Sequence, residues 1–342
     1  FRKSRDVPSL RQDFSRFAQE HRGEFDVIVV SRPHNLMAVT PLVRHYFPRA
    51  RLIYDAEALY FRRDYTYLDY VDKVTNGTRT VDPITRVALI RSKARELLIF
   101  NEVDGFIAVS ELERQYTLTR LPHFVGQAYV VPDVSTPPAF RTTPAHRHDI
   151  LFLGAFHGNM YYNGDAVAYF LRRILPLVRQ RLPPEQSPVT IVGSSPPREL
   201  IGLANTASNV TVLGFVEFLE PVFARARVLV IPHRYAAGIP IKAFTAASQG
   251  VPVVIADSAN LGFGMNASYG VTTADSDEAF ASAVIDHLTR TDVWERQAAN
   301  LAKFHRYYNQ KTFTGHLRRI FESTARTACH APPVREHRPS GE

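Results

Sequence analysis

The chain has little cysteine, and this scarcity limits the chemistry it can perform. Cys329 is the one cysteine among 342 residues, which excludes an internal disulfide and a cysteine-based metal site. A chain without disulfides suits a reducing compartment, so we predict a cytoplasmic protein. The sequence begins at Phe1 without a visible signal peptide, and we expect it to be a piece of a longer protein.

Long apolar runs are also missing from the sequence. Because no stretch is long enough to cross a bilayer, we expect at most a peripheral association with the inner face of the membrane. Apolar residues make up 45% and charged residues 22%, as in soluble globular proteins. A chain of 342 residues exceeds one ordinary core and predicts two domains.

Lysine is scarce, although the chain is basic. Lysines supply six of the 41 basic side chains, and the formal net charge is +8. A nucleic-acid partner would fit this charge, but the arginines are scattered and form no basic run. Clustering rather than total charge marks a binding face, so we expect no nucleic acid and a mildly positive cleft for anionic ligands.

Strand and helix patterns alternate in two blocks, separated by a proline-rich segment at 135–148 that predicts a linker. This alternation predicts α/β domains with parallel, doubly wound sheets. No strand candidate precedes Asp26, so the first sheet is expected to lack its usual first strand. The expected units are a first domain at 1–140, a second domain at 141–305, a terminal helix at 306–328 and a loose tail at 329–342.

The expected elements follow from these patterns. The expected strands are 26–30, 51–54, 105–109, 129–131, 149–153, 189–192, 210–213, 228–231 and 251–255. The expected helices are 36–46, 83–100, one from Glu111 capped by Ser110, 163–181, 197–204, 217–224, 277–290 and 291–328.

The most informative segment is IPHRYAAGIPIKAFTAASQGVPVV, from Ile231 to Val254. It predicts a strand end, a glycine-containing loop, a short helix and a second strand. The start of a helix offers unpaired N–H groups and positive potential, so it suits a phosphate, and Arg234 and Lys242 would add charge-assisted bonds. An ordinary helix with Lys242 in solvent is the alternative, and we favour the diphosphate site.

Three other residues of this segment belong to the predicted site. Gly238 precedes Pro240, and proline is favoured in the first turn of a helix. Thr245 follows Lys242 by three residues, so both side chains share one face of the helix and could point into a cleft.

A long loop after the strand at 149–153 contains Gly154 and His157. It exceeds what a strand-to-helix turn requires, so it could surround a diphosphate or a sugar. A plain turn with Asn163 as helix N-cap is the equally weighted alternative.

A glycine also ends the strand at 210–213. Gly214, followed by Phe215 and Val216, would let the backbone approach a flat ring. A simple turn glycine is the alternative here.

An acidic pair follows the second strand of the first domain. In IYDAEALYFRR, Asp55 and Glu57 have the alternate spacing that puts both carboxylates on one side of an extended segment. They could orient hydroxyl groups or act as a base. A local ion pair with Arg62 or Arg63 is equally consistent with the sequence.

Patterns for a metal are weak. Asp275-Ser276-Asp277 matches a motif of metal-dependent sugar transfer, but it directly precedes a helical pattern and is better explained as a helix cap. The histidines are dispersed, so we expect no metal.

Four segments together resemble the retaining glycosyltransferases of group 1, often called family 4, which have the GT-B fold. The segments are YDAEALYFRR, VDGFIAVSELER, LFLGAFHGNMYYNGDAVAYF and, most specifically, RYAAGIPIKAFTAASQGVPVV. The resemblance covers most of the chain and extends to domains of large multi-domain bacterial members. It implies two Rossmann-like domains with doubly wound parallel sheets that face a cleft, and a terminal helix that crosses back to the first domain.

The resemblance implies a nucleotide-sugar donor bound mainly by the second domain and a glycan or lipid-linked acceptor bound mainly by the first. It implies neither cofactor nor metal, and it allows other domains of a longer parent chain as partners. The catalytic candidates are Asp55 and Glu57, chosen from their position after a strand, and His157 of the long loop. The implied donor-binding residues are Gly154, His157, Gly214, Phe215, Val216, Arg234, Gly238, Ile239, Pro240, Lys242 and Thr245.

The chain departs from the family at two positions, with Thr245 and Ala237 where acidic residues are usual. The family glutamate at the first of these binds the ribose hydroxyls, and a threonine accepts fewer hydrogen bonds. Three hypotheses therefore stand. The favoured one is a retaining hexosyltransferase in bacterial surface polysaccharide assembly. The others are a non-catalytic GT-B domain that binds glycan or a partner domain, and a sugar-nucleotide epimerase or hydrolase.

Overall fold

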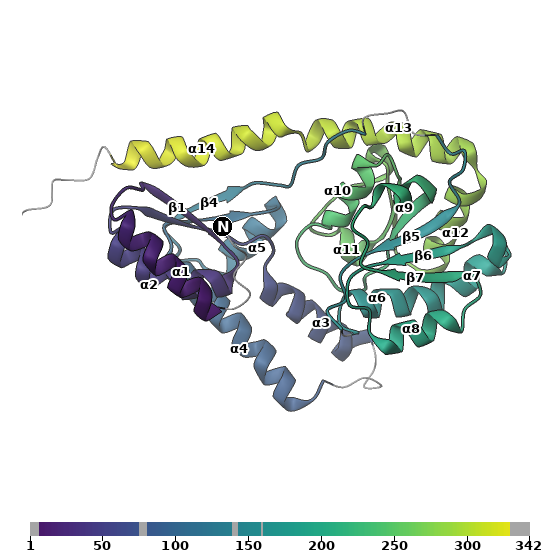
Figure 1. Cartoon of the computed structure of the whole chain (residues 1–342), viewed down its shortest axis with the longest axis horizontal. Coiled ribbons are helices and arrows are strands. Elements are labelled where there is room, and N and C mark those ends of the chain that lie inside the picture. Colours follow the sequence, from purple (N-terminus) through teal and green to yellow (C-terminus); the bar gives the residue numbers. More distant parts are fainter. Residues whose placement is uncertain (1–6, 75–80, 139–142, 159, 329–342) are drawn as a thin grey trace, which may run out of the picture.

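Short runs of β-branched and aromatic residues become the strands of two parallel sheets, and each sheet is the centre of one domain (Figure 1). The computed structural model describes residues 7–74, 81–138, 143–158 and 160–328. The expected tail and part of the expected linker lie outside these residues. Among the described helices, none combines the length and apolar composition needed to span a bilayer.

The four strands of the first sheet run in consecutive order, β1-β2-β3-β4. Their bounds are β1 Val27–Ser31, β2 Arg51–Asp55, β3 Gly105–Ala108 and β4 Gln127–Val130. The helices of this domain are α1 Val7–Glu20, α2 Pro33–Tyr46, α3 Tyr60–Val74, α4 Pro83–Ile99, η1 Phe100–Glu102 and α5 Glu111–Arg120. Right-handed crossovers between consecutive parallel strands stay on one face, and α2, α4 and α5 pack there in one apolar cluster.

The other face of the first sheet is covered by a helix from the far end of the chain. Helix α14 (Gln310–Ala328) runs along this sheet in Figure 1. Its residues Phe313, Leu317 and Ile320 recur at helical spacing and pack with Ile53 and Ile107 of the sheet. The first domain is therefore completed by a segment about 180 residues downstream of its last strand.

The second sheet has the order β10-β9-β8-β5-β6-β7, with helices on both faces. The strands are β5 Asp149–Leu153, β6 Val189–Val192, β7 Val210–Gly214, β8 Ala226–Ile231, β9 Val253–Ala256 and β10 Val271–Ala274. The helices are α6 Asn163–Tyr169, η2 Phe170–Ile174, α7 Leu175–Arg179, η3 Pro184–Gln186, α8 Arg198–Asn205, α9 Glu220–Arg225, α10 Ile241–Ser248, α11 Asp257–Asn260, η4 Ala267–Tyr269, α12 Asp277–Thr289 and α13 Thr291–Tyr307.

The strand order of the second sheet reverses between β5 and β8, which lie side by side. The chain builds outward from β5 to β7 on one side and from β8 to β10 on the other. Such a switch point leaves a crevice outside the carboxyl ends of the two strands, where doubly wound sheets bind ligands. The loops at this crevice are 154–162 after β5 and 232–240 after β8.

The observed elements differ from the expected ones in several places, and neither β10 nor α11 is among the expected elements. The expected helix 163–181 contains the π-helical turn η2, because Pro176 lacks the N–H that a regular α-helix would use. The expected helix 291–328 breaks between α13 and α14. Helix α3 is not among the expected helices, although it lies between the two domains in Figure 1.

We expect Ile320→Ala to loosen α14 from the first sheet. Ile320 is 1% exposed, and truncating an isoleucine in a packed site costs about 2–5 kcal/mol. Hydrogen exchange should become faster across Gln310–Ala328, while the strands of the second sheet keep their rates. Thr314→Ala, on the exposed side of the same helix, is the control. Unchanged protection of α14 in Ile320→Ala would contradict its role as the cover of the sheet.

Candidate active site

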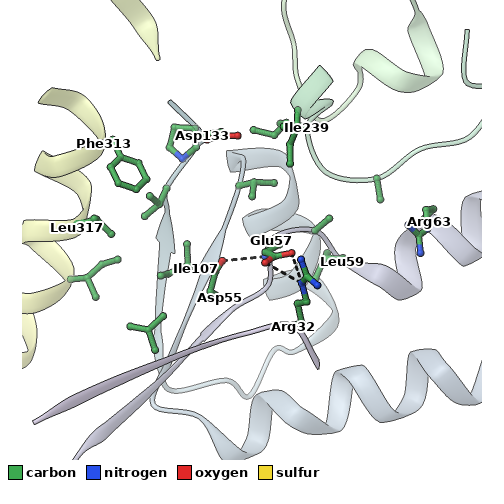
Figure 2. Close-up of a pocket in the computed structure, with 18 of the residues that line it drawn as sticks. Arg32, Asp55, Glu57, Leu59, Arg63, Ile107, Asp133, Ile239, Phe313 and Leu317 are labelled. Atoms are coloured by element: carbon green, nitrogen blue, oxygen red, sulfur yellow. Dashed lines mark hydrogen bonds and ion pairs between the residues drawn. The ribbon is translucent and has the colours of Figure 1, made fainter. Parts of the chain in front are cut away.

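A cavity of about 570 Å³ lies at the carboxyl edge of the first sheet, between α14 and the second-domain loop 237–241. Figure 2 shows residues of both domains around it. The end of every strand in the first sheet contributes to the lining, as expected for ligand sites of parallel sheets. The lining includes Val29, Arg32, Asp55, Glu57, Arg63, Ile107, Val131, Asp133, Tyr162, Ala237, Ile239, Ile241, Phe313, Leu317, Ile320 and Phe321.

Both predicted carboxylates lie in this cavity. Asp55 accepts a hydrogen bond from Ser31 Oγ at 2.7 Å and another from the backbone N–H of Glu57 at 3.2 Å. Glu57 accepts from Arg32 Nε at 3.0 Å, as the dashed lines of Figure 2 show. Asp55 therefore fixes the loop after β2, and Glu57 forms an ion pair with a residue that follows β1.

The Arg32–Glu57 pair is held on a strained backbone. Arg32 has φ 76° and Glu57 has φ 50°, a region that residues other than glycine rarely adopt. Each such residue costs on the order of 1–3 kcal/mol and persists only where its surroundings enforce it. Strain of this kind gathers at functional sites, and here both strained residues line one cavity and bind each other.

A second cluster lies at the switch point of the second sheet, around Lys242 in the first turn of α10. Lys242 Nζ donates to Asn163 Oδ1 at 2.9 Å, and His233 Nε2 lies 2.9 Å from the same oxygen. The ammonium group also lies 4.6 Å from the centre of the Phe152 ring. Lys242 therefore does not point into solvent, as the alternative interpretation of α10 required.

Burial controls the charges of this cluster. It lowers the pKa of Lys242 to about 7, because the ammonium group loses its hydration. It also lowers the pKa of His233 well below 6.5, and the nearby charge of Lys242 adds to this effect. His233 is therefore neutral at physiological pH, and the partners of Lys242 in the described structure are Asn163, His233 and the Phe152 ring.

Arg234 has different partners from those that the resemblance implies. Its guanidinium forms two bonds with Asp165, at 2.5 Å and 3.2 Å, and lies 4.6 Å from the ring centres of Tyr70 and Tyr169. A carboxylate already balances this charge. The predicted contact between Arg234 and a diphosphate remains a prediction.

Gly238 makes one of the hydrogen bonds that join the two domains. Its backbone N–H donates to Glu113 Oε1 of α5 at 2.7 Å, so the amide implied to face sugar or phosphate is already engaged. Gly238 has φ 73°, and a Cβ there would lie 2.8 Å from the Cβ of Ala58. Glu113 is fully buried and also lies 3.5 Å from Arg62, and burial raises the pKa of its carboxyl.

Helix α3 adds an aromatic contact between the domains. The ring of Tyr67 lies 5.1 Å from Tyr161 and 5.0 Å from Tyr235. The hydroxyl of Tyr161 donates to Asp64 Oδ1 of α3 at 3.0 Å. These contacts hold the loops of the switch point against the first domain.

The remaining predicted residues are spread over the second domain. Ile239 is the one predicted donor residue that lines the described cavity, and Pro240 is the N-cap residue of α10. Thr245 Oγ1 donates back to the Ile241 carbonyl at 3.4 Å. Gly154 packs tightly, because a Cβ there would meet Asn163 at 2.8 Å.

His157 and the loop after β7 lie away from the cavity. His157 is exposed at φ 53°, and Gly214 has φ 69°. The Phe215 side chain is 75% exposed, while Val216 packs on the core of the domain. Their predicted roles remain predictions.

Two helix-cap interpretations can be checked directly. Ser110 accepts from the backbone N–H of Glu113 at 3.2 Å, and Ser276 accepts from that of Ala279 at 3.2 Å, so both residues cap helices. Asn163 is not an N-cap, because Tyr162 occupies that position. In the described part of the chain, no group of three or more histidine, cysteine or carboxylate side chains could hold a metal ion.

Sequence reasoning missed Arg32, Glu113, Asn163 and His233 as site residues. Glu113 could have been found from the sequence, since it is the second glutamate of the VSELE segment that supports the resemblance. His233 directly precedes Arg234 at the end of β8, where ligand-binding residues are common. Arg32 has no comparable signal.

Comparison with known proteins finds a family match in the second domain. Residues 147–290 match the family model of group 1 glycosyl transferases. No curated protein sequence matches the chain.

Solved structures resemble nearly the whole chain. Sucrose-phosphate synthase from Thermosynechococcus elongatus has 16% identity and a TM-score of 0.71, over 94% of this chain and 78% of that one. A UDP-forming α,α-trehalose-phosphate synthase from Burkholderia xenovorans has 11% identity and a TM-score of 0.66, over 95% and 79%. S. aureus TarM, in complex with UDP, has 10% identity and a TM-score of 0.65, over 90% and 58%. The expected α/β GT-B fold is thereby confirmed.

We expect Glu113→Gln to change how stability depends on pH. Because burial raises the pKa of Glu113 above 4.5, the fold favours the neutral carboxyl. The stability that this group contributes is full below pH 4.5 and is lost as the pH rises through the raised value. A glutamine is neutral at every pH, so the melting temperature of the variant should increase relative to that of the wild type as the pH rises.

The control for this experiment is Glu102→Gln, at an exposed carboxylate of the same domain. Its melting temperature should keep a constant offset from the wild type. If Glu113→Gln behaves in the same way, Glu113 carries no desolvation cost in the fold.

We expect the stability of the wild type, relative to Lys242→Met, to increase with pH. The folded chain binds fewer protons than the unfolded chain between the folded pKa of about 7 and the ordinary value of 10.5. The contribution of Lys242 is therefore full above 10.5 and is lost as the pH falls through about 7, a span of roughly 3–5 kcal/mol. Thermal unfolding of both proteins across this range measures it. Lys303→Met, at an exposed lysine, should show no such trend.

Proposed function

We propose that this chain is a glycosyltransferase that moves a sugar from a nucleotide-sugar donor to an acceptor hydroxyl. One observation carries the proposal: the Lys242 amine is desolvated at a helix start, and its partners in the described structure are neutral. A bound anion would favour the charged form of this amine and be stabilised by it. Lys242 lies within the segment that matches the group 1 glycosyl transferases.

The proposed position of the donor diphosphate is outside the carboxyl ends of β5 and β8. Helices α6 and α10 both begin there, and Asn163 and Lys242 in their first turns already contact each other. Backbone N–H groups at the two helix starts would add to the charge of Lys242. Because these groups supply positive charge, the proposal includes no metal and no cofactor.

The proposed acceptor site is the cavity at the edge of the first sheet. In the transfer, the bond between the anomeric carbon and the diphosphate oxygen breaks, and a bond to the acceptor oxygen forms. The acceptor proton passes to a carboxylate, for which Glu57 is our candidate because it lines the cavity and is 40% exposed. Asp55 acts as a positioning residue, because it binds the backbone N–H of Glu57.

The finer parts of the proposal rest on the resemblance of the motif segments. They are a hexosyl group, retention of configuration, a glycan or lipid-linked acceptor, and a role in bacterial surface polysaccharide assembly. The proposed place of action is the cytoplasm or the inner face of the membrane, with other domains of a longer chain as partners.

A non-catalytic GT-B domain is the second candidate, and three contacts favour it. Arg234 is neutralised by Asp165, the N–H of Gly238 is bonded to Glu113, and Thr245 donates to its own helix. In such a domain, these groups would serve the contact between the domains rather than a donor.

We expect a nucleoside diphosphate to raise the melting temperature of the chain. UDP, GDP, ADP and dTDP should be screened, because the structure does not select a base. A concentration one hundred times the Kd adds about 2.7 kcal/mol of stability. Lys242→Met removes the positive charge and should abolish the shift, whereas Lys303→Met, at an exposed lysine, should retain it.

Arg234→Gln tests the role that the resemblance implies. If Asp165 neutralises Arg234, the variant loses stability but keeps its response to the diphosphate at saturating concentration. The absence of a shift with all four compounds would overturn the proposed transfer. Release of diphosphate from a nucleotide sugar would overturn the non-catalytic alternative.

A further inference from the structure

The cavity at the first sheet has an extended apolar wall. The wall combines α14 with strands of the sheet, and its side chains are Phe313, Leu317, Ile320, Val29, Ile107 and Val131. In Figure 2, Phe313 and Leu317 lie on α14 across from Ile107 of β3. A volume of about 570 Å³ falls within the range of small-molecule sites, which are mostly apolar with a few placed polar groups.

Apolar side chains at this cavity remain in contact with water. Val29 is 43% exposed, Phe321 is 49% exposed, and Ile241 is 65% exposed. They come from β1, α14 and α10, so three separate elements of two domains expose apolar surface to one space. Burying such surface is favourable, and its concentration in a concave region marks a binding site.

The polar groups of the cavity are gathered beside this wall. The Arg32–Glu57 pair has side chains that are 51% and 40% exposed, and Asp133 follows β4. Arginine donates hydrogen bonds and carboxylates accept them, so together they suit a ligand rich in hydroxyl groups. A wholly polar ligand would leave the apolar wall without a matching surface.

The cavity also reaches the proposed donor region. Ile241 of α10 lines the cavity, and so does Tyr162, whose ring centre lies 4.5 Å from that of His233, a neighbour of Lys242. An acceptor in the cavity would therefore lie beside the cluster proposed to hold the diphosphate.

From these observations we infer that the chain acts on an amphiphilic acceptor. The hydroxyl-bearing head contacts Arg32 and Glu57, and an apolar aglycone fills the space between α14 and the first sheet. The inference rests on the proposed function in calling the ligand an acceptor, but the binding site itself rests on the lining of the cavity.

A homologous series of alkyl glucosides tests the inference. Methyl, butyl, hexyl and octyl β-glucoside are titrated into the full 342-residue chain by calorimetry, each below its micelle-forming concentration. Burial of each further methylene strengthens binding about three- to fourfold until the cavity is filled. Equal or undetectable binding along the series would overturn the inference.

Two variants locate the binding. Phe321→Arg and Leu317→Gln should each weaken octyl glucoside at least about tenfold, because they place polar atoms against the buried chain. Phe321 is 49% exposed, so its variant should fold even if Leu317→Gln is destabilised. Leu98→Arg is the matched control, since Leu98 is 63% exposed on α4 and does not line the cavity. Equal weakening by Leu98→Arg would also overturn the inference.

The same proteins separate this inference from the proposed transfer. Phe321→Arg should keep the melting-temperature shift with a nucleoside diphosphate, because Lys242 is unchanged. If no nucleoside diphosphate shifts the melting temperature but binding still strengthens with alkyl chain length, the proposed sugar transfer is wrong and the site for an amphiphilic ligand stands. If a nucleoside diphosphate binds but all alkyl glucosides bind equally, the proposed sugar transfer remains and the inferred apolar aglycone is wrong.

Discussion

The bond from the backbone N–H of Gly238 to the buried carboxylate of Glu113 determines how the two domains meet. It fixes the loop before α10 against Ala58, where even a methyl group on Gly238 would clash. That loop forms one wall of the cavity, and Lys242 lies in the first turn of the helix that follows the loop. Burial makes the bond consequential, since removing either partner would leave a polar group without water. The geometry of both proposed subsites therefore depends on this contact, together with those of Tyr67 and Tyr161.

The second domain contains two cations whose surroundings give them different roles. Arg234 has a bidentate carboxylate and two aromatic faces, so its charge is balanced within the protein. Lys242 has an amide oxygen, a neutral imidazole and a ring, none of which carries a formal charge. The charge of Arg234 is therefore balanced within the protein, whereas the charged form of Lys242 has no anionic partner in the described structure.

Much of the fold could be predicted, because strands of parallel sheets are short apolar runs that can be read locally. The same reading placed Asp55 and Glu57 at a strand end, and both line the cavity. Pairs between distant segments could not be predicted. Arg32, which follows β1, binds Glu57, which follows β2, and Asp165 neutralises Arg234, which lies 69 residues away in the sequence. Nothing in the spacing of either pair indicates that its members meet. Helix α3, which is rich in tyrosine and aspartate, was also missed, although its apolar residues recur at helical spacing.

The terminal helix links the fold to the chemistry of the cavity. A sheet with consecutive strand order places its crossover helices on one face, and the other face needs a cover from elsewhere. Helix α14 provides this cover. The apolar face of α14 extends beyond the residues that contact the sheet to Phe321, which remains half exposed. The surplus apolar surface lies beside the strained Arg32–Glu57 pair. Because strain and exposed apolar area both cost free energy, their coincidence in one cavity fits a ligand with a polar head and an apolar body.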